Sequence, residues 1–224
     1  MTTPRFNVFN QIHKALRALM FNTVMQIQQT DMNDTNASAP VLIQTALLLE
    51  IFDAHAYYED NFILAAAEKH DPALVAEFES EHVTDLQLTE KLREQLSAYE
   101  IADDKRAAGN GIYYALNDFV AFNLHHMNKE ESLLNQMLWA NYTDEEIVAM
   151  EHAITAHIPA EKMPVYFEWM IKGINDPELA AWLKAVQFGA PDFVFNGLFE
   201  ACGVFLSAPR FDVLKSNIAA PVCA

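Results

Sequence analysis

Histidine and glutamate side chains with the spacing of metal ligands stand out in residues 1–141. His126 and Glu130 lie one helical turn apart in the apolar segment FVAFNLHHMNKEESLLNQM, residues 119–137. Side chains at positions i and i+4 project from the same face of a helix. Burying an imidazole and a carboxylate there is costly unless a partner compensates them, and a metal ion is a common partner. His125 lies about 100° around the helix axis from His126, so we expect it on the surface or just outside the ligands.

The same His-xxx-Glu spacing recurs earlier in the chain, and single histidines lie on two further apolar stripes. The predicted metal ligands are His13, His55, Glu59, His82, His126 and Glu130. Imidazoles combined with carboxylates suit a borderline transition metal such as iron, manganese or zinc, rather than calcium or magnesium. Two carboxylates can also bridge a pair of ions inside a helical bundle.

Four long segments with helical periodicity carry these ligands. They cover residues 4–30, 41–69, 72–102 and 104–141, and polar or Asp-Pro signals separate them. Ser38 is the predicted cap of the second helix. If the helices alternate in direction, a rise of about 1.5 Å per residue brings all the ligands to roughly one level. The sequence therefore predicts an all-α fold, with an antiparallel up-down-up-down four-helix bundle over residues 1–141.

Residues 142–224 have a different character. Prolines divide this part into short pieces that are rich in large apolar side chains, among them Trp169, Trp182, Phe193 and Phe199. A solvated appendage would carry fewer such residues. We therefore expect a C-terminal extension of short helices that packs on the bundle or on a partner subunit, which is compatible with a homodimer.

Composition and charge limit the classes of partner. The formal charge of −17 argues against nucleic acid and against anionic membrane surfaces. The sequence shows no signal-peptide pattern and no apolar run of the about 18 residues that a membrane helix needs. Cys202 and Cys223 form no CxxC pattern, and we expect both to be free thiols. A cytoplasmic protein without nucleic-acid or membrane partners is the simplest prediction.

With these ligands in order on four helices, the sequence resembles the hemerythrin-like (HHE cation-binding) domain family. The likeness covers residues 5–140 and includes the segments FNQIHKALR, residues 9–17, and FNLHHMNKEE, residues 122–131. It implies a non-heme site of two iron ions with carboxylate bridges and an oxo, hydroxo or aqua ligand. It also implies that the protein binds or senses oxygen, a related small molecule such as peroxide or nitric oxide, or iron.

Two other functions stay open. One is a diiron enzyme that acts on peroxide or nitric oxide, or that repairs iron centres. The other is a helical protein that binds a partner and has lost its metal.

One position departs from the family pattern. Hemerythrins proper carry His-xxx-His on the third helix, whereas the residue one turn after His82 is Leu86. We expect Leu86 on the ligand-bearing face, where it leaves one ion short of a ligand. Asp85, or less well Glu81, could complete the site, water could fill the position, or only one ion could bind tightly. An asymmetric centre would favour sensing or reactive chemistry over reversible oxygen carriage.

Overall fold

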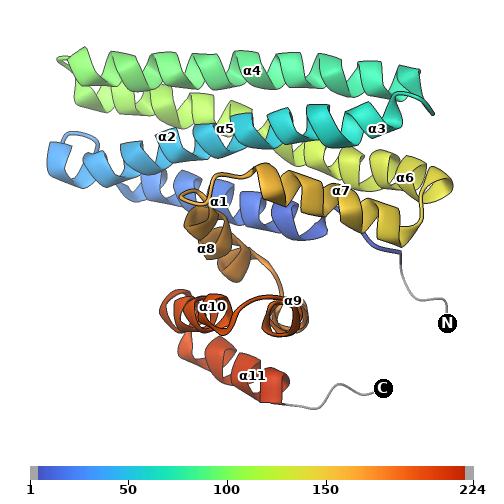
Figure 1. Cartoon of the computed structure of the whole chain (residues 1–224). Coiled ribbons are helices and arrows are strands. Elements are labelled where there is room, and N and C mark those ends of the chain that lie inside the picture. The colour runs from blue at the N-terminus through green and yellow to red at the C-terminus, as the bar shows by residue number, and fades with distance from the viewer. Residues whose placement is uncertain (1–4, 220–224) are drawn as a thin grey trace. The chain divides into compact units, whose positions relative to one another are not determined.

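The computed structural model describes residues 5–219, and every regular element in that range is helical (Figure 1). The predicted all-α fold class is therefore confirmed for these residues. Four long helical segments come first, and two of them contain a turn of π-helix: α1 (Asn10–Gln29); α2 (Thr35–Tyr58), which continues through η1 (Glu59–Leu64) and α3 (Ala65–Ala67); α4 (Pro72–Ile101); and α5 (Lys105–Lys129), which continues through η2 (Glu130–Leu134) and α6 (Asn135–Asn141). Five shorter helices follow: α7 (Asp144–His157), α8 (Met163–Gly173), α9 (Asp176–Gly189), α10 (Asp192–Phe205) and α11 (Ala208–Ala219).

Aspartate caps open three of the long helices. The Asp34 carboxylate accepts hydrogen bonds from two backbone N–H groups in the first turn of α2, and Asp71 and Asp104 do the same for one N–H each in α4 and α5. The predicted Ser38 cap is wrong, because Asp34 starts α2 one turn earlier. Ser38 is instead buried, and its hydroxyl accepts a hydrogen bond of 2.9 Å from Tyr99.

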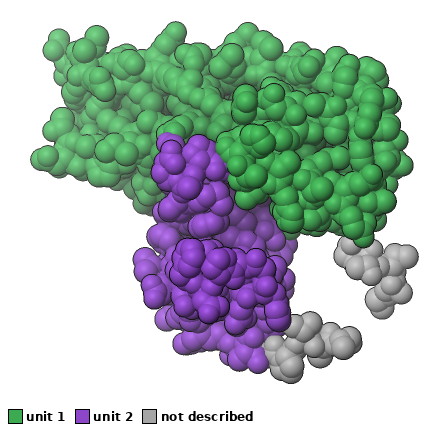
Figure 2. Space-filling model, viewed as in Figure 1, with its two compact units in different colours: residues 1–10, 19–157 green, residues 11–18, 158–224 purple. Residues whose placement is uncertain are grey.

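The chain divides into two compact units, shown in different colours in Figure 2. Unit 1 comprises residues 1–10 and 19–157, and unit 2 comprises residues 11–18 and 158–224. In this division α7 belongs with the long helices, since its Ile147 is buried in the same core cluster as Ile63, Phe78 and Leu134. The predicted domain boundary at residue 142 stays a prediction.

Unit 2 has a hydrophobic core of its own. Helices α8 to α11 contribute buried residues to it, including Ile171, Leu183, Leu198 and Leu214. These residues lie on the apolar faces of short helices. The large apolar side chains of this part of the chain therefore form a core between α8, α9, α10 and α11.

One stretch of unit 1 is long and apolar enough to cross a membrane, judged by length and composition alone. It is Thr35–Ala67, whose most apolar window has a mean hydropathy of 1.4 and is 39% buried. Core helices of globular proteins meet the same criterion, and Leu48, Phe52 and Glu59 of this stretch are buried in the structure. The absence of a membrane partner stays a prediction.

Candidate metal centre

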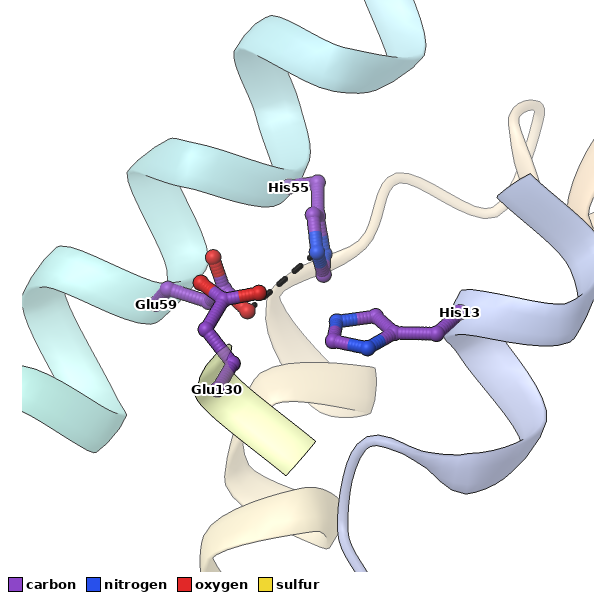
Figure 3. A group of neighbouring side chains, drawn as sticks. All are labelled: His13, His55, Glu59 and Glu130. Atoms are coloured by element: carbon purple, nitrogen blue, oxygen red, sulfur yellow. Dashed lines mark ion pairs between the residues drawn. The ribbon is translucent and has the colours of Figure 1, made fainter. Parts of the chain in front are cut away.

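The predicted ligands come together in two groups, in each of which the ligand atoms lie within 4.8 Å of one another. Figure 3 shows the first group, whose imidazoles and carboxylates face one another. Glu59 and Glu130 belong to both groups, so each carboxylate can offer an oxygen to each of two ions. The first group is His13, His55, Glu59 and Glu130, and the second is Glu59, His82, His126 and Glu130.

Each of the four long helical segments supplies one histidine: His13 lies on α1, His55 on α2, His82 on α4 and His126 on α5. Helix α1 is continuous from Asn10 to Gln29, so the helix that carries His13 also carries residues of unit 1 on both sides of it. The four histidines therefore lie on four successive helical segments, as the sequence predicts.

The two shared carboxylates occupy equivalent places in the backbone. Glu59 is the first residue of the π-helical turn η1, and Glu130 is the first residue of η2. Single π-turns inside α-helices are rare and occur frequently at functional sites. Sequence reasoning missed both turns, because a His-xxx-Glu pair has the same spacing whether or not the helix widens after it.

The carboxylates lie deep inside unit 1, since Glu59 is 3% and Glu130 is 1% exposed. His55 Nε2 lies 3.2 Å from Glu59 Oε1, the ion pair dashed in Figure 3. His126 Nε2 lies 3.0 Å from Glu130 Oε1 in the second group. Buried carboxylates require cations or strong donors around them, and a metal ion shared by nitrogen and oxygen ligands meets that requirement.

The imidazoles of the second group have an orientation suited to a metal. The Nδ1 atom of His82 lies 2.7 Å from Asp60 Oδ1, and the Nδ1 atom of His126 lies 2.8 Å from Glu81 Oε2. An ionised carboxylate only accepts hydrogen bonds, so Nδ1 donates in both contacts. The two Nε2 atoms lie 3.1 Å apart, and both lie beside the shared carboxylates, at 3.6 Å from Glu59 Oε2 for His82 and at 3.0 Å from Glu130 Oε1 for His126. The donor atoms therefore fit a metal ion bound through Nε2.

The histidines of the second group hold protons strongly when no metal ion is bound. Burial lowers the pKa of His82, but hydrogen bonds to Asp60, Glu130 and Glu59 outweigh it and raise this pKa to about 12. Burial likewise lowers the pKa of His126, whereas Glu130 and Glu81 raise it to about 9. A metal ion that binds here must displace these protons, which couples metal affinity to pH.

A comparison with protein families supports the same assignment. The family profile described as hemerythrin HHE cation binding domain matches residues 6–138, a range that contains every predicted ligand. The chain belongs to the hemerythrin HHE cation-binding domain family. The suspected resemblance is thereby confirmed, and helices α7 to α11 lie beyond the matched range. No curated protein and no solved structure matches the chain.

The expectation that Leu86 lies on the ligand-bearing face of this hemerythrin-family domain is wrong. Leu86 is 54% exposed, whereas Asp85 is 6% exposed and faces the interior. Two consecutive four-residue steps, from Phe78 to Leu86, turn a helix by about 80° beyond two full turns, which carries Leu86 off the buried stripe. The buried side chain at this level of α4 is therefore the Asp85 carboxylate.

Neither acid suggested as an extra ligand belongs to the two ligand groups. Asp85 accepts a hydrogen bond of 2.6 Å from Asn123 Nδ2, and burial raises the pKa of its carboxyl group. Glu81 contacts the ring of His126 on the side away from the ligand groups. Each group holds two histidines and both shared carboxylates, and the expectation that one ion is short of a ligand stays a prediction.

Other residues considered from the sequence lie apart from the centre. His125 is exposed, as predicted, one position from the buried His126. Cys202 is buried in the core of unit 2, and burial raises the pKa of its thiol to about 11, which makes it unreactive. Cys223 lies outside the described residues.

Proposed function

We propose that this hemerythrin-family protein holds two iron ions. Through them it binds or senses oxygen or a related small molecule such as peroxide or nitric oxide, or it senses iron by binding the ions themselves. The observation that carries the proposal is the pair of ligand groups with Glu59 and Glu130 in common. Two ions that share both carboxylates form a dinuclear centre of the kind that helical bundles hold. Bound iron would supply reversible ferrous and ferric states and an open coordination position for the small molecule.

The chain's own contribution is to fix the ligands and to keep water away from them. Aromatic rings pack against two of the imidazoles: Phe52 meets His55 edge-on, while Phe78 and Phe122 pack against His126. The Phe122 and His126 rings are stacked, with an angle of 14° between their planes. Such an apolar shell limits solvent access and sets the dielectric around a metal centre.

The long helices fit the arrangement that this centre needs. Short connections, residues 30–34, 68–71 and 102–104, favour an antiparallel up-down-up-down bundle of the four segments. The acidic composition and the absence of a CxxC pattern favour a cytoplasmic setting without nucleic-acid or membrane partners.

The test is to express the chain with iron, measure metal per chain, and then follow the absorption spectrum of the reduced protein. Each of oxygen, peroxide and nitric oxide is added separately under otherwise anaerobic conditions. About two irons per chain and a stoichiometric spectral change with one of these molecules, without turnover, are the expected results. Repeated consumption of peroxide or nitric oxide would favour the enzyme alternative instead, and a folded protein that retains no metal would refute the proposal.

A further inference from the structure

Two carboxylates outside the ligand groups contact the histidines of the second group. Asp60 directly follows Glu59 on the π-turn η1 and reaches across to His82 on α4, at 2.7 Å. Glu81 directly precedes His82 on α4 and reaches across to His126 on α5, at 2.8 Å. Each carboxylate therefore holds a histidine that belongs to a different helical segment.

Glu81 is itself fixed by a cation. Its Oε2 atom contacts His126, and its Oε1 atom accepts a hydrogen bond from Lys129, which also donates to Glu77. Because both oxygens are engaged, the Glu81 side chain has little freedom to turn away from the ring.

These carboxylates lie closer to solvent than the ligands that they contact. The Asp60 side chain is 46% exposed and that of Glu81 is 24% exposed, against 10% for His82 and 5% for His126. Neither carboxylate belongs to the ligand groups, and both contact Nδ1 atoms, which lie on the side of each imidazole ring away from Nε2. Carboxylates that orient the histidine ligands of a metal from outside commonly contact the ring nitrogen that does not bind the metal.

We propose that Asp60 and Glu81 are positioning residues, which hold His82 and His126 with Nδ1 protonated and Nε2 aimed at one of the two metal ions. The inference rests on the proposed function, since it requires that the second group binds an ion. A carboxylate partner fixes the tautomer and the ring angle of a metal-binding histidine and makes its other nitrogen a stronger ligand. Because His82 and His126 belong only to the second group, losing either carboxylate weakens one ion and spares the other.

The first test compares Asp60→Asn and Glu81→Gln with wild type and with the control Glu79→Gln. Glu79 is exposed on the same helix, so its substitution removes the same charge without touching either histidine. Metal-free protein is titrated anaerobically with ferrous iron against a competing chelator. Asp60→Asn and Glu81→Gln should bind one ion as wild type does and the other about 10- to 100-fold more weakly, while Glu79→Gln should match wild type.

The outcomes separate the two proposals. Wild type that binds fewer than two ions contradicts the proposed dinuclear centre, whatever the variants do. Wild type that binds two ions, with Asp60→Asn and Glu81→Gln binding both as tightly, overturns the positioning roles. Equal weakening of both ions overturns them as well, because that result indicates a general loss of structure.

A second measurement needs no variant and covers the case in which a substitution prevents folding. Nitrogen-15 NMR of zinc-loaded wild type should show His82 and His126 with a protonated Nδ1 that exchanges slowly with water and a metal-bound Nε2. Metal bound through Nδ1, or a rapidly exchanging Nδ1 proton on either ring, would overturn the assignment.

Discussion

The candidate ligands differ in whether they belong to one ligand group or to both. His55 belongs to one ligand group, whereas Glu130 belongs to both. His55→Ala should therefore reduce bound iron from about two ions to about one per chain, and Glu130→Ala should weaken both ions. Metal analysis of purified variants measures the effect, with His125→Ala as a control because His125 is exposed. Similar losses in all three variants would show that the two groups do not bind metal.

Protonation of His126 makes the stability of the metal-free protein depend on pH. Its pKa is raised from 6.5 to about 9, so the stability that it contributes is complete below pH 6.5 and is lost as the pH rises through about 9. The contribution is on the order of 3 kcal/mol, at about 1.4 kcal/mol per pKa unit. In denaturant titrations of metal-free protein, wild type should lose more stability between pH 6.5 and pH 10 than His126→Gln. Parallel losses would contradict this assignment.

Metal binding should show the opposite trend with pH. Protons compete with the ion for His82 and His126, whose pKa values are raised to about 12 and about 9. Iron affinity should therefore rise as the pH increases from 6 to 8, and binding should release protons. Titrations in buffers of different ionisation enthalpy measure that release, and affinity that does not change with pH would speak against ligation by these two histidines.

At the scale of the helices, sequence periodicity predicted which segments are helical but not every detail of their faces and turns. The spacing of apolar residues and the His-xxx-Glu pairs placed on four helical segments the six residues that the structure gathers into two groups, because a single helix face repeats reliably over a few turns. The prediction that Leu86 lies on the ligand-bearing face was wrong, because each four-residue step along α4 adds about 40° to a full turn. The π-turns at Glu59 and Glu130 have no periodic signal, and the contacts of Asp60 and Glu81 depend on side chains from neighbouring helices.

The exposed position of Leu86 changes the expected effect of a histidine there. Leu86→His would restore the His-xxx-His pattern of hemerythrins proper, but its side chain would project into solvent instead of towards the ligand groups. Iron affinity should therefore stay within about twofold of wild type, as is usual for surface substitutions, and the number of ions per chain should not change. Chelator competition measures both quantities. A third tightly held histidine ligand in this variant would mean that α4 turns its other face to the centre.

For the molecule as a whole, bound metal would act as a cross-link between helical segments. The ligands come from α1, α2, α4 and α5 and from the two π-turns, so bound ions connect parts of the chain that are distant in sequence. Ligand binding to the native state alone stabilises it by about 4 kcal/mol when free metal exceeds Kd 1,000-fold. Removing iron with a chelator should lower the Tm of wild type, and the same chelator should leave the Tm of Glu130→Ala nearly unchanged. Equal shifts would show that the chelator acts elsewhere.

Charge is divided unequally between the two units, and the excess of negative charge affects the stability of unit 1. Acidic and basic side chains are equal in number in unit 2, so the formal charge of −17 resides entirely in unit 1. Repulsion within an acidic unit opposes its compact state, which makes its buried apolar contacts more important for stability. Helix α7 supplies some of them, since Ile147 is fully buried there and Met150 and Ile154 pack against the same core.

The position of α7 predicts different behaviour for two truncations of the chain. A chain that ends at Tyr142 lacks α7 and leaves the apolar surface around Ile63 and Leu134 open to water, whereas a chain that ends at His157 keeps this surface covered. Exposed apolar patches of this kind promote aggregation. The shorter chain should therefore aggregate and unfold at a lower temperature than the longer one, as size-exclusion chromatography and circular dichroism would show. Both chains lose residues 158–224, which otherwise contact residues 11–18 through the Lys14–Glu178 ion pair at 2.6 Å, so any difference between them reports on α7. Two truncated chains with the same solubility and the same Tm would contradict this role.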